Sequence, residues 1–388
     1  MKKVERYDKE SGIITIGDVI NMKNVYEFFE SKKFFFSEEI LTCYFLSLKT
    51  KPFVILTGIS GTGKTKIAQI FADYMCQDED DEAKEKRIAF IPVRPDWMDN
   101  KGLLGFYNIL DQKYHSTILL DLLLNAKANP DKPHFVILDE MNLAKVEYYF
   151  SDFLSTMESR TQDNPGGEKI PLHSLTEAKT PAGRDIPDKI QIPQNLFFTG
   201  TVNVDETTYM FSPKVLDRAN VIEFNEVNLE GYTSSSVENA FSLDNPDVRN
   251  RLMDSEASPF CSKADYLKFK EIVGNEANSI ENLLNLLKKY NLHFGYRVVN
   301  ETSRFVWHSK DLLGDQFNLN AAMDIQILQK ILPKFHGTRG KLEDPLKDLH
   351  AFCKAEYSQG DALYPRSARK IARMIENLNI QGYTSFIE

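Results

Sequence analysis

The segment KPFVILTGISGTGKTKIAQIF, residues 51–71, decides the fold that we expect for this chain of 388 residues. Its first part is short, apolar and rich in β-branched residues, as in a buried strand, and its last part has the apolar spacing of a helix. Between the two, residues 58–65 fit the pattern G-x-x-x-x-G-K-[ST]. The segment therefore predicts a strand, a phosphate-binding loop (P-loop) and a helix, in that order.

Each residue type in this loop has a chemical reason. Glycines lack Cβ, so the backbone N–H groups around them can curve about a β-phosphate at the positive end of the following helix. We expect the Lys64 ammonium to neutralise the β- and γ-phosphates and the Thr65 hydroxyl to ligate Mg²⁺. The predicted nucleotide-binding residues of the loop are Gly58, Ile59, Ser60, Gly61, Thr62, Gly63, Lys64 and Thr65.

Strands and helices alternate after this loop. Such alternation predicts an α/β fold with a parallel sheet that helices cover on both faces. Residues 161–194, rich in glycine, proline and charge, are expected to form a long loop or hairpin insertion, and its length indicates a functional role. We expect further strands at 87–93, 134–140, 195–203 and 220–227, and helices at 117–128 and 144–159.

Composition and periodicity divide the chain into four regions. A short helical segment at 1–48 precedes the nucleotide-binding core at 49–228. Residues 229–264, which contain SSS, DNPD and SEASP, are expected to be a polar linker. Helical periodicity returns in residues 265–388, so we expect a helical lid and C-terminal domain there.

Two polar strand ends supply further groups that phosphoryl transfer needs. Residues 135–140, FVILDE, are an apolar strand ending in two acids, at the edge where open α/β sheets bind ligands. We expect Asp139 to hold Mg²⁺ through its water shell and Glu140 to orient and polarise the attacking water. Asn203 ends the next strand, where its amide can hydrogen-bond both the water and the γ-phosphate. The alternative is a structural role: Asp139 and Glu140 would then mark only a strand end at the surface, and Asn203 would be an asparagine in a turn.

Arg218 precedes the expected strand at 220–227, at the edge of the nucleotide domain. An arginine there can reach the γ-phosphate bound by a neighbouring subunit, and its permanently charged fork suits transition-state stabilisation. The alternative is a local salt bridge, for example with Asp217.

The order of these motifs, followed by a helical lid, resembles the AAA+ ATPase superfamily over residues 50–380. Four longer segments look like its McrB-like branch, the GTP-hydrolysing motor subunits of modification-dependent restriction systems. They are PDWMDNKGLLGFYN at 95–108, VILDEMNLAKVEYYFSDFLSTMES at 136–159, FTGTVNVDETTYMFSPKVLDRA at 198–219 and FGYRVVNE at 294–301.

This resemblance implies a fold, an activity and partners. The fold is an AAA+ P-loop αβα core with a parallel sheet, followed by an α-helical lid. The activity is hydrolysis of GTP or ATP with Mg²⁺ by a homo-hexameric ring, which drives a McrC-like nuclease in DNA restriction or phage defence and meets DNA through the complex or a partner. By analogy, Lys64, Thr65, Asp139, Glu140 and Asn203 take the roles given above, Arg218 is the finger acting in trans, and Arg297 in FGYR is the nucleotide-binding lid arginine called sensor 2.

Two features differ from the family's restriction enzyme. That enzyme carries a separate N-terminal domain for modified DNA, whereas about 50 residues precede the P-loop here, which argues against intrinsic recognition of methylated bases. The family's nucleotide signature Met-Asn-Thr-Ala-Asp corresponds here to Val202-Asn203-Val204-Asp205, which keeps Asn and Asp at a spacing shifted by one. The choice between GTP and ATP therefore stays open.

Two other functions compete with the restriction motor. One is a MoxR-type, chaperone-like AAA+ ATPase that remodels protein complexes. The other is a nucleotide-gated scaffold without turnover, against which the intact set of Lys64, Asp139 and Glu140 argues.

The formal net charge of −9 indicates that the surface as a whole repels nucleic acid. Any DNA contact is therefore expected from a local basic stripe or from a partner chain. Residues 330–373 hold ten lysines and arginines against five acids, which favours either an electrostatic footprint or a solvated helical face.

No segment has the apolar length of a signal peptide or of a membrane helix. The four cysteines, Cys43, Cys76, Cys261 and Cys353, lack the spacing of a zinc site or a disulfide framework. We therefore expect a cytoplasmic protein with free thiols and no membrane partner.

Overall fold

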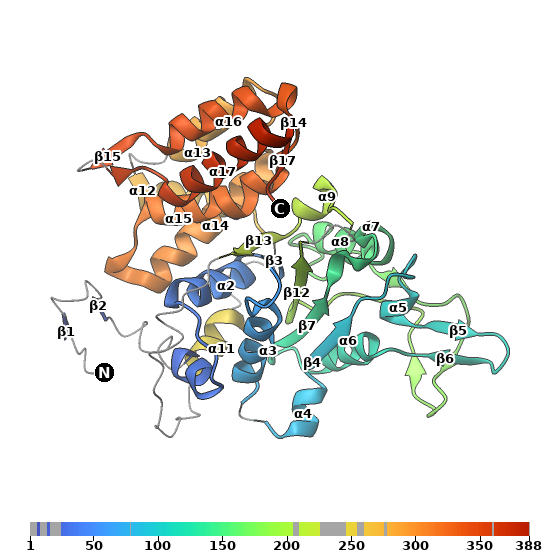
Figure 1. The fold of residues 1–388 in the computed structure, drawn as a ribbon. Coiled ribbons are helices and arrows are strands. Elements are labelled where there is room, and N and C mark those ends of the chain that lie inside the picture. Colours follow the sequence, from blue (N-terminus) through green and yellow to red (C-terminus); the bar gives the residue numbers. More distant parts are fainter. Residues whose placement is uncertain are drawn as a thin grey trace.

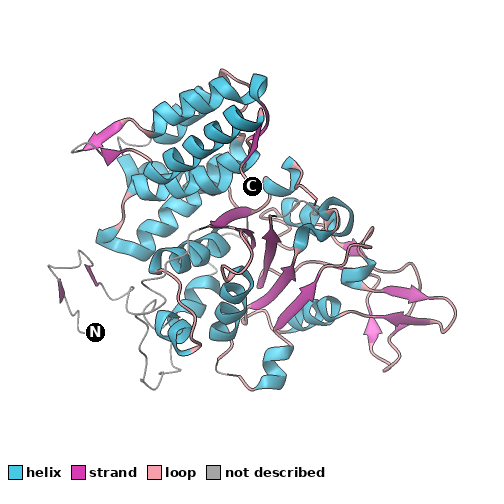
Figure 2. Cartoon of the chain, viewed as in Figure 1, coloured by secondary structure: helices cyan, strands magenta, loops and turns pink. Residues whose placement is uncertain are grey.

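A parallel sheet of five strands forms the centre of the computed structural model (Figure 1, Figure 2). The structure describes residues 6–7, 14–15, 25–77, 79–204, 209–225, 246–253, 260–274, 278–358 and 361–387. The strand order is β13-β3-β12-β7-β4, and all neighbouring strands are parallel. The strands are β3 (Phe53–Gly58), β4 (Ile88–Pro92), β7 (His134–Asp139), β12 (Leu196–Asn203) and β13 (Asn220–Phe224).

The strands are nearly continuous apolar runs because helices pack on the sheet. All six residues of β3 are buried. Helix α3 packs on β3, β7 and β12, α6 on β4 and β7, and α2 on β3. The expected α/β fold with a parallel sheet is confirmed. The helices of this part are α2 (Glu38–Thr50), α3 (Lys64–Met75), α4 (Asp81–Glu85), α5 (Lys101–Leu104), α6 (Ile118–Ala128), α7 (Val146–Tyr149), α8 (Ser151–Glu158) and α9 (Pro213–Leu216), and residues 25–31 are also helical.

The helix expected at 144–159 is two helices, because the chain bends at Phe150. This residue ends α7 and precedes α8 with φ −114° and ψ 4°, outside the helical range. Its ring is fully buried and stacks on Phe153 with 4.9 Å between ring centroids. It also meets Phe198 of the sheet edge-on. Burial of this ring against the sheet therefore outweighs helix continuity.

Short antiparallel strands extend from one end of the sheet (Figure 1). The insertion expected at 161–194 contains two small pairs, β8 (Ile170–Pro171) with β11 (Lys189–Ile190) and β9 (Ala178–Lys179) with β10 (Asp185–Ile186). The hairpin of β5 (Phe106–Asn108) and β6 (Lys113–His115) lies beside it, with β6 contacting β9. No sequence pattern predicted this hairpin.

Helices make up most of the C-terminal part, which lies above the sheet in Figure 1. They are α12 (Lys263–Val273), α13 (Asn278–Lys288), α14 (Tyr296–Leu313), α15 (Leu319–Gln326), the π-helical η4 (Ile327–Ile331), α16 (Arg339–Cys353) and α17 (Pro365–Gln381). Two small strand pairs accompany them, β14 (His336–Thr338) with β17 (Tyr383–Ser385) and β15 (Glu356–Ser358) with β16 (Asp361–Ala362).

Most of the expected linker at 229–264 lies outside the described residues. Helix α11 (Pro246–Met253) and the start of α12 fall within that range. Near the N-terminus, β1 (Arg6–Tyr7) pairs with β2 (Ile14–Thr15). Among the helices of the described ranges, none combines the length and the apolar character that crossing a membrane requires.

A buried ion pair joins two helices of the C-terminal helical part, residues 260–387, which is called the lid below. Asp265 of α12 accepts hydrogen bonds from two nitrogen atoms of Arg304 in α14, Nε (2.9 Å) and Nη2 (3.0 Å). The same carboxylate accepts from Trp307 Nε1 (3.1 Å) and from the backbone N–H of Ser262 (2.7 Å), where it closes a capping box. Because every donor faces one buried carboxylate, the pairing of α12 with α14 depends on Asp265.

We expect Asp265→Ala to lower the free energy of unfolding by about 3–5 kcal/mol, because the substitution leaves the Arg304 guanidinium buried without its counter-charge. Urea unfolding followed by tryptophan fluorescence measures this directly, since Trp307 contacts the same carboxylate. The matched control is Glu82→Ala, which removes the surface pair with Lys86 and should change stability much less. Equal shifts for the two variants would contradict this account of the lid.

Candidate functional site

The loop between β3 and α3 has glycine where its backbone requires it. Gly58 has φ +138°, and a Cβ there would lie 2.3 Å from the carbonyl oxygen of Phe224. Gly63, at the start of α3, has φ +90°, and a Cβ there would lie 2.9 Å from the ring of Phe36. Any other residue would clash and strain the backbone at both positions. Glycine therefore allows the strand to turn directly into the helix.

Lys64 lies in the first turn of α3, and its side chain is buried under the loop. The ammonium donates hydrogen bonds to the carbonyl oxygens of Gly58 (2.9 Å) and Ile59 (2.7 Å). Burial lowers the pKa of Lys64, and the Asp139 carboxylate opposes that shift. The outer side of the loop is open, since Ile59 is 50% exposed. The one cation of the loop thus lies directly beneath its exposed backbone.

A chain of side-chain contacts links the loop to the lid. The Ile59 N–H donates to Asn225 Oδ1 (3.3 Å), and Asn225 Nδ2 donates to Glu223 Oε1 (2.5 Å). The same Glu223 oxygen accepts from Lys370 Nζ of α17 (2.5 Å). These contacts connect residues 59 and 370, which no sequence pattern had brought together.

The carboxyl ends of β7 and β12 bring hydroxyl and carboxylate groups against the P-loop helix. Asp139 Oδ1 accepts hydrogen bonds from the hydroxyls of Thr65 (2.8 Å) and Thr201 (2.7 Å). Thr65 and Asp139 were predicted to act together, whereas Thr201 was missed. The signal was available, because Thr201 lies two residues before Asn203 on one strand and therefore shares its face.

Glu140 follows β7 in a left-handed backbone conformation, with φ 53° and ψ 49°. Its N–H donates to Thr201 Oγ1 (3.1 Å), and its Oε1 accepts from Asn203 Nδ2 (3.2 Å). A positive φ is uncommon for a residue other than glycine and is often found at functional sites. The structure therefore brings Glu140 and Asn203 together next to Asp139.

The donor set at this edge fits Mg²⁺. The Thr65 hydroxyl and the Asp139 carboxylate present hard oxygen ligands next to the loop, which is the ligand type that Mg²⁺ prefers. The described part of the chain has no cluster of three or more His, Cys, Asp or Glu placed to hold a metal. Such a cluster is not required, because Mg²⁺ usually takes one or two protein ligands and completes its shell with phosphate and water.

Arg218 and Arg297 meet at one carboxylate, that of Glu158 at the end of α8. Arg218 Nη2 pairs with Glu158 Oε2, and Arg297 Nη1 lies 2.6 Å from Glu158 Oε1. Asp217, the partner considered for Arg218 from the sequence, instead pairs with Arg297 Nη2 (3.4 Å) and with Lys334. Neither arginine takes part in the contacts described above for Lys64, Asp139 and Glu140. Glu158 had no sequence signal of its own.

The ten basic residues of 330–373 do not form a free basic stripe. Six of them are paired with carboxylates, and several of these pairs join the lid to the core. The electrostatic-footprint interpretation is therefore weakened. The six are Lys330, Lys334, Arg339, Lys347, Arg366 and Lys370.

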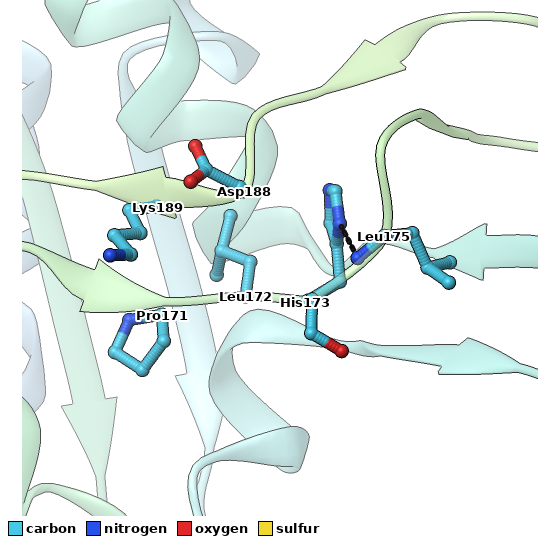
Figure 3. A pocket seen from close by; sticks show the side chains of 7 residues that line it. Pro171, Leu172, His173, Leu175, Asp188 and Lys189 are labelled. Carbon is cyan, nitrogen blue, oxygen red and sulfur yellow. Dashed lines mark hydrogen bonds between the residues drawn. The ribbon is translucent and has the colours of Figure 1, made fainter.

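A hollow in the insertion lies beside the end of β8 and the start of β11, and His173 is one of the residues that line it (Figure 3). His173 Nδ1 accepts from the Leu175 N–H (3.3 Å), and its Nε2 donates to the carbonyl oxygen of Ile186 (3.0 Å). Because both ring nitrogens bond within the insertion, this histidine has a structural role here.

Comparisons with known proteins found a sequence relative, a family model and a solved structure that are similar to parts of this chain. A 227-residue stretch is 24% identical to the "Type IV methyl-directed restriction enzyme EcoKMcrB subunit" of Escherichia coli (strain K12), covering 58% of this chain and 43% of that relative. This chain thus matches less than half of the relative's length. Residues 247–383 match the family described as "Domain of unknown function (DUF8727)". The crystal structure of a proposed ATPase from Cytophaga hutchinsonii aligns with a TM-score of 0.44 and 14% identity, over 81% of this chain and 88% of that one.

The chain is thus similar to the McrB subunit over part of its length, and it carries a P-loop motif on a parallel sheet. Asp205, the acid of the nucleotide signature, lies outside the described residues.

We expect Thr201→Val to lower Mg²⁺-dependent nucleotide turnover about tenfold. In this variant Asp139 loses one of its two hydroxyl donors, and the Glu140 N–H loses its acceptor. Leaving a buried polar group without its hydrogen bond costs about 1–3 kcal/mol. Thr201→Ser keeps the hydroxyl and should stay within about twofold of the native rate. Steady-state phosphate release measures both rates. A fully active Val variant would show that Thr201 does not hold the site.

Proposed function

We propose that this chain is an AAA+ nucleoside triphosphatase that hydrolyses GTP or ATP with Mg²⁺. In this proposal it works as a homo-hexameric ring that drives a McrC-like nuclease in McrBC-like DNA restriction or phage defence. The observation that carries the proposal is the Thr65–Asp139 hydrogen bond beside the Asn203–Glu140 hydrogen bond. It joins the P-loop helix to the two strand ends that phosphoryl transfer requires.

Nucleotide phosphates would bind over the P-loop backbone. Lys64 now donates to two loop carbonyls, and an anionic phosphate offers a stronger, charge-assisted acceptor at the same place. Thr65 and Asp139 are the residues that would hold Mg²⁺, which when bound neutralises charge on the β- and γ-phosphates. The positive end of α3 adds to this attraction.

Glu140 is the proposed base for the attacking water. Its carboxylate stands at the open edge of the sheet, and the Asn203 amide holds one of its oxygens. The other oxygen is available to orient a water and take up its proton. Asn203 can in turn donate to the γ-phosphate, because an amide carries two N–H groups.

Arg218 is proposed to act on the nucleotide of the neighbouring subunit. Its side chain is 23% exposed and that of its partner Glu158 is 43% exposed. Ion pairs with this exposure contribute little, about 0–1 kcal/mol. Arg218 can therefore exchange Glu158 for a γ-phosphate across an interface at small cost. Arg297 shares the same carboxylate and is proposed as the lid arginine at the nucleotide.

The nuclease partner and DNA enter the proposal only through the similarity to the restriction subunit. Stimulation of hydrolysis by DNA in the presence of a McrC-like nuclease would favour the restriction motor. Hydrolysis that responds to a protein substrate and not to DNA would favour the MoxR-type alternative. Competition between GTP and ATP in the same assay identifies the preferred nucleotide.

We expect Glu140→Gln to bind nucleotide with native affinity but to lose turnover by at least about a hundredfold, since an amide cannot take up the proton of the water. Lys64→Ala should instead weaken binding itself, because the charge on the phosphates is lost. Fluorescent-nucleotide titration and phosphate release separate the two effects. Native turnover by the Gln variant would remove Glu140 from the mechanism.

We expect Arg218→Ala subunits and Lys64→Ala subunits to be inactive alone and to regain part of the activity when mixed. A mixed ring contains interfaces that pair an intact P-loop on one subunit with an intact arginine on the next. Turnover as a function of mixing ratio is the measurement. If Arg218 serves only its own chain through Glu158, mixing will restore nothing and the finger assignment fails.

A further inference from the structure

A cluster of three buried charges lies where the lid meets the sheet. The Glu301 carboxylate of α14 pairs through Oε1 with Lys51 Nζ and through Oε2 with Lys330 Nζ (2.6 Å). The side chains of Lys330, Glu301 and Lys51 are 0%, 4% and 14% exposed. Lys51 follows α2, whereas Lys330 lies in η4, which packs against β13. Three distant segments therefore meet at the Glu301 carboxylate.

The two lysines of this cluster also hold the turn that carries Arg218. Lys330 Nζ donates to the carbonyl oxygens of Ala219 (2.8 Å) and Asp217 (3.3 Å), and Lys51 Nζ lies 3.4 Å from the same Asp217 oxygen. These two carbonyls flank Arg218 on both sides. The backbone of the arginine is thus fixed by cations that one lid carboxylate holds in place.

The two lysines need the negative charge of Glu301 to keep these contacts with the turn. Burial alone raises the pKa of Glu301, but Lys330 and Lys51 outweigh it and bring the pKa down to about 2. Burial lowers the pKa of Lys51 to about 8 in spite of the nearby carboxylate. Without the carboxylate, two ammonium groups would repel each other in a buried place. They would then separate or lose a proton, and the contacts with the turn would loosen.

A second residue of α14, Arg297, also contacts this turn. Arg297 lies four residues before Glu301 on α14, so the two side chains share one face of the helix. Arg297 contacts the Asp217 and Glu158 carboxylates, while Glu301 acts through the lysines on the backbone. A shift of α14 relative to the sheet therefore displaces both Arg297, which shares the Glu158 carboxylate with Arg218, and the support of the Arg218 backbone.

We propose that Glu301, acting through Lys51 and Lys330, is a positioning residue that sets Arg218 for action on the neighbouring subunit, so that the lid of the arginine donor controls hydrolysis at the next site. This inference rests on the proposed role of Arg218 in trans. It assigns the control to the subunit that supplies the arginine and not to the subunit that holds the nucleotide.

The test uses the mixed rings of full-length subunits, with Lys64→Ala chains as arginine donors and Arg218→Ala chains as P-loop acceptors. Glu301→Gln keeps the shape of the side chain and removes its charge. Added to the donor, it should lower the restored turnover by at least about tenfold, because small displacements of a catalytic group have large effects on rate. Added to the acceptor, it should leave turnover within about twofold.

The matched control is Glu343→Gln, since Glu343 also bridges two basic residues, Arg339 and Lys347, but on the surface of α16. Glu343→Gln should leave turnover unchanged whether it is placed in the donor chain or in the acceptor chain. Lys330→Met is a second test variant, because it keeps the Lys51–Glu301 pair and removes the donor to Ala219; it should reproduce the donor-only loss. Nucleotide binding by each acceptor chain confirms folding.

Equal losses in donor and acceptor would mean that Glu301 has a purely structural role, and no loss in either would mean that it has none in positioning. Both outcomes overturn the inference while leaving the trans role of Arg218 intact. If the unmodified donor and acceptor chains fail to restore activity together, the proposed trans role itself fails, and the two failures are thereby distinguished.

Discussion

The carboxyl ends of β3, β7 and β12 lie along one edge of the sheet because these strands are parallel. Register then sets which groups meet. Gly58 lies opposite Asn203, and Gly200 lies opposite Leu138, so that Thr201 follows beside Asp139. A slip of one residue would turn every side chain of a strand to the other face. The polar cluster therefore depends on the burial of the apolar strands, which fixes this register, more than on its own hydrogen bonds.

The junction of lid and core combines two kinds of electrostatic contact. Glu158 with Arg218 and Arg297 forms partly exposed pairs, which can exchange partners at low cost. Glu301 with its two lysines is buried, and separating those charges is expensive because each would remain without a counter-charge. The lid is thus joined to the core by partly exposed ion pairs at Glu158, which can change partners, and by buried ion pairs at Glu301, which are costly to separate.

Local patterns named several of the residues that the structure brings together at the candidate site. The glycine and lysine spacing located the P-loop, and the polar ends of apolar strands located Asp139 and Asn203, because strand ends converge wherever a sheet is parallel. The same approach missed Thr201, although it shares a strand with Asn203. It also expected one helix where Phe150 divides two, since the ring is buried against a sheet that helical periodicity does not take into account.

By itself, the sequence determined the order of the five sheet strands and the positions where the backbone needs glycine, because both follow from residues that are neighbours in the chain. Only the tertiary structure decided which carboxylate each basic residue at the junction of lid and core meets. Arg218 pairs across 60 residues, Arg297 across 139 and Lys51 across 250. The charged ends of long side chains carry no local signal of their partner, so the packing of lid on core selects it.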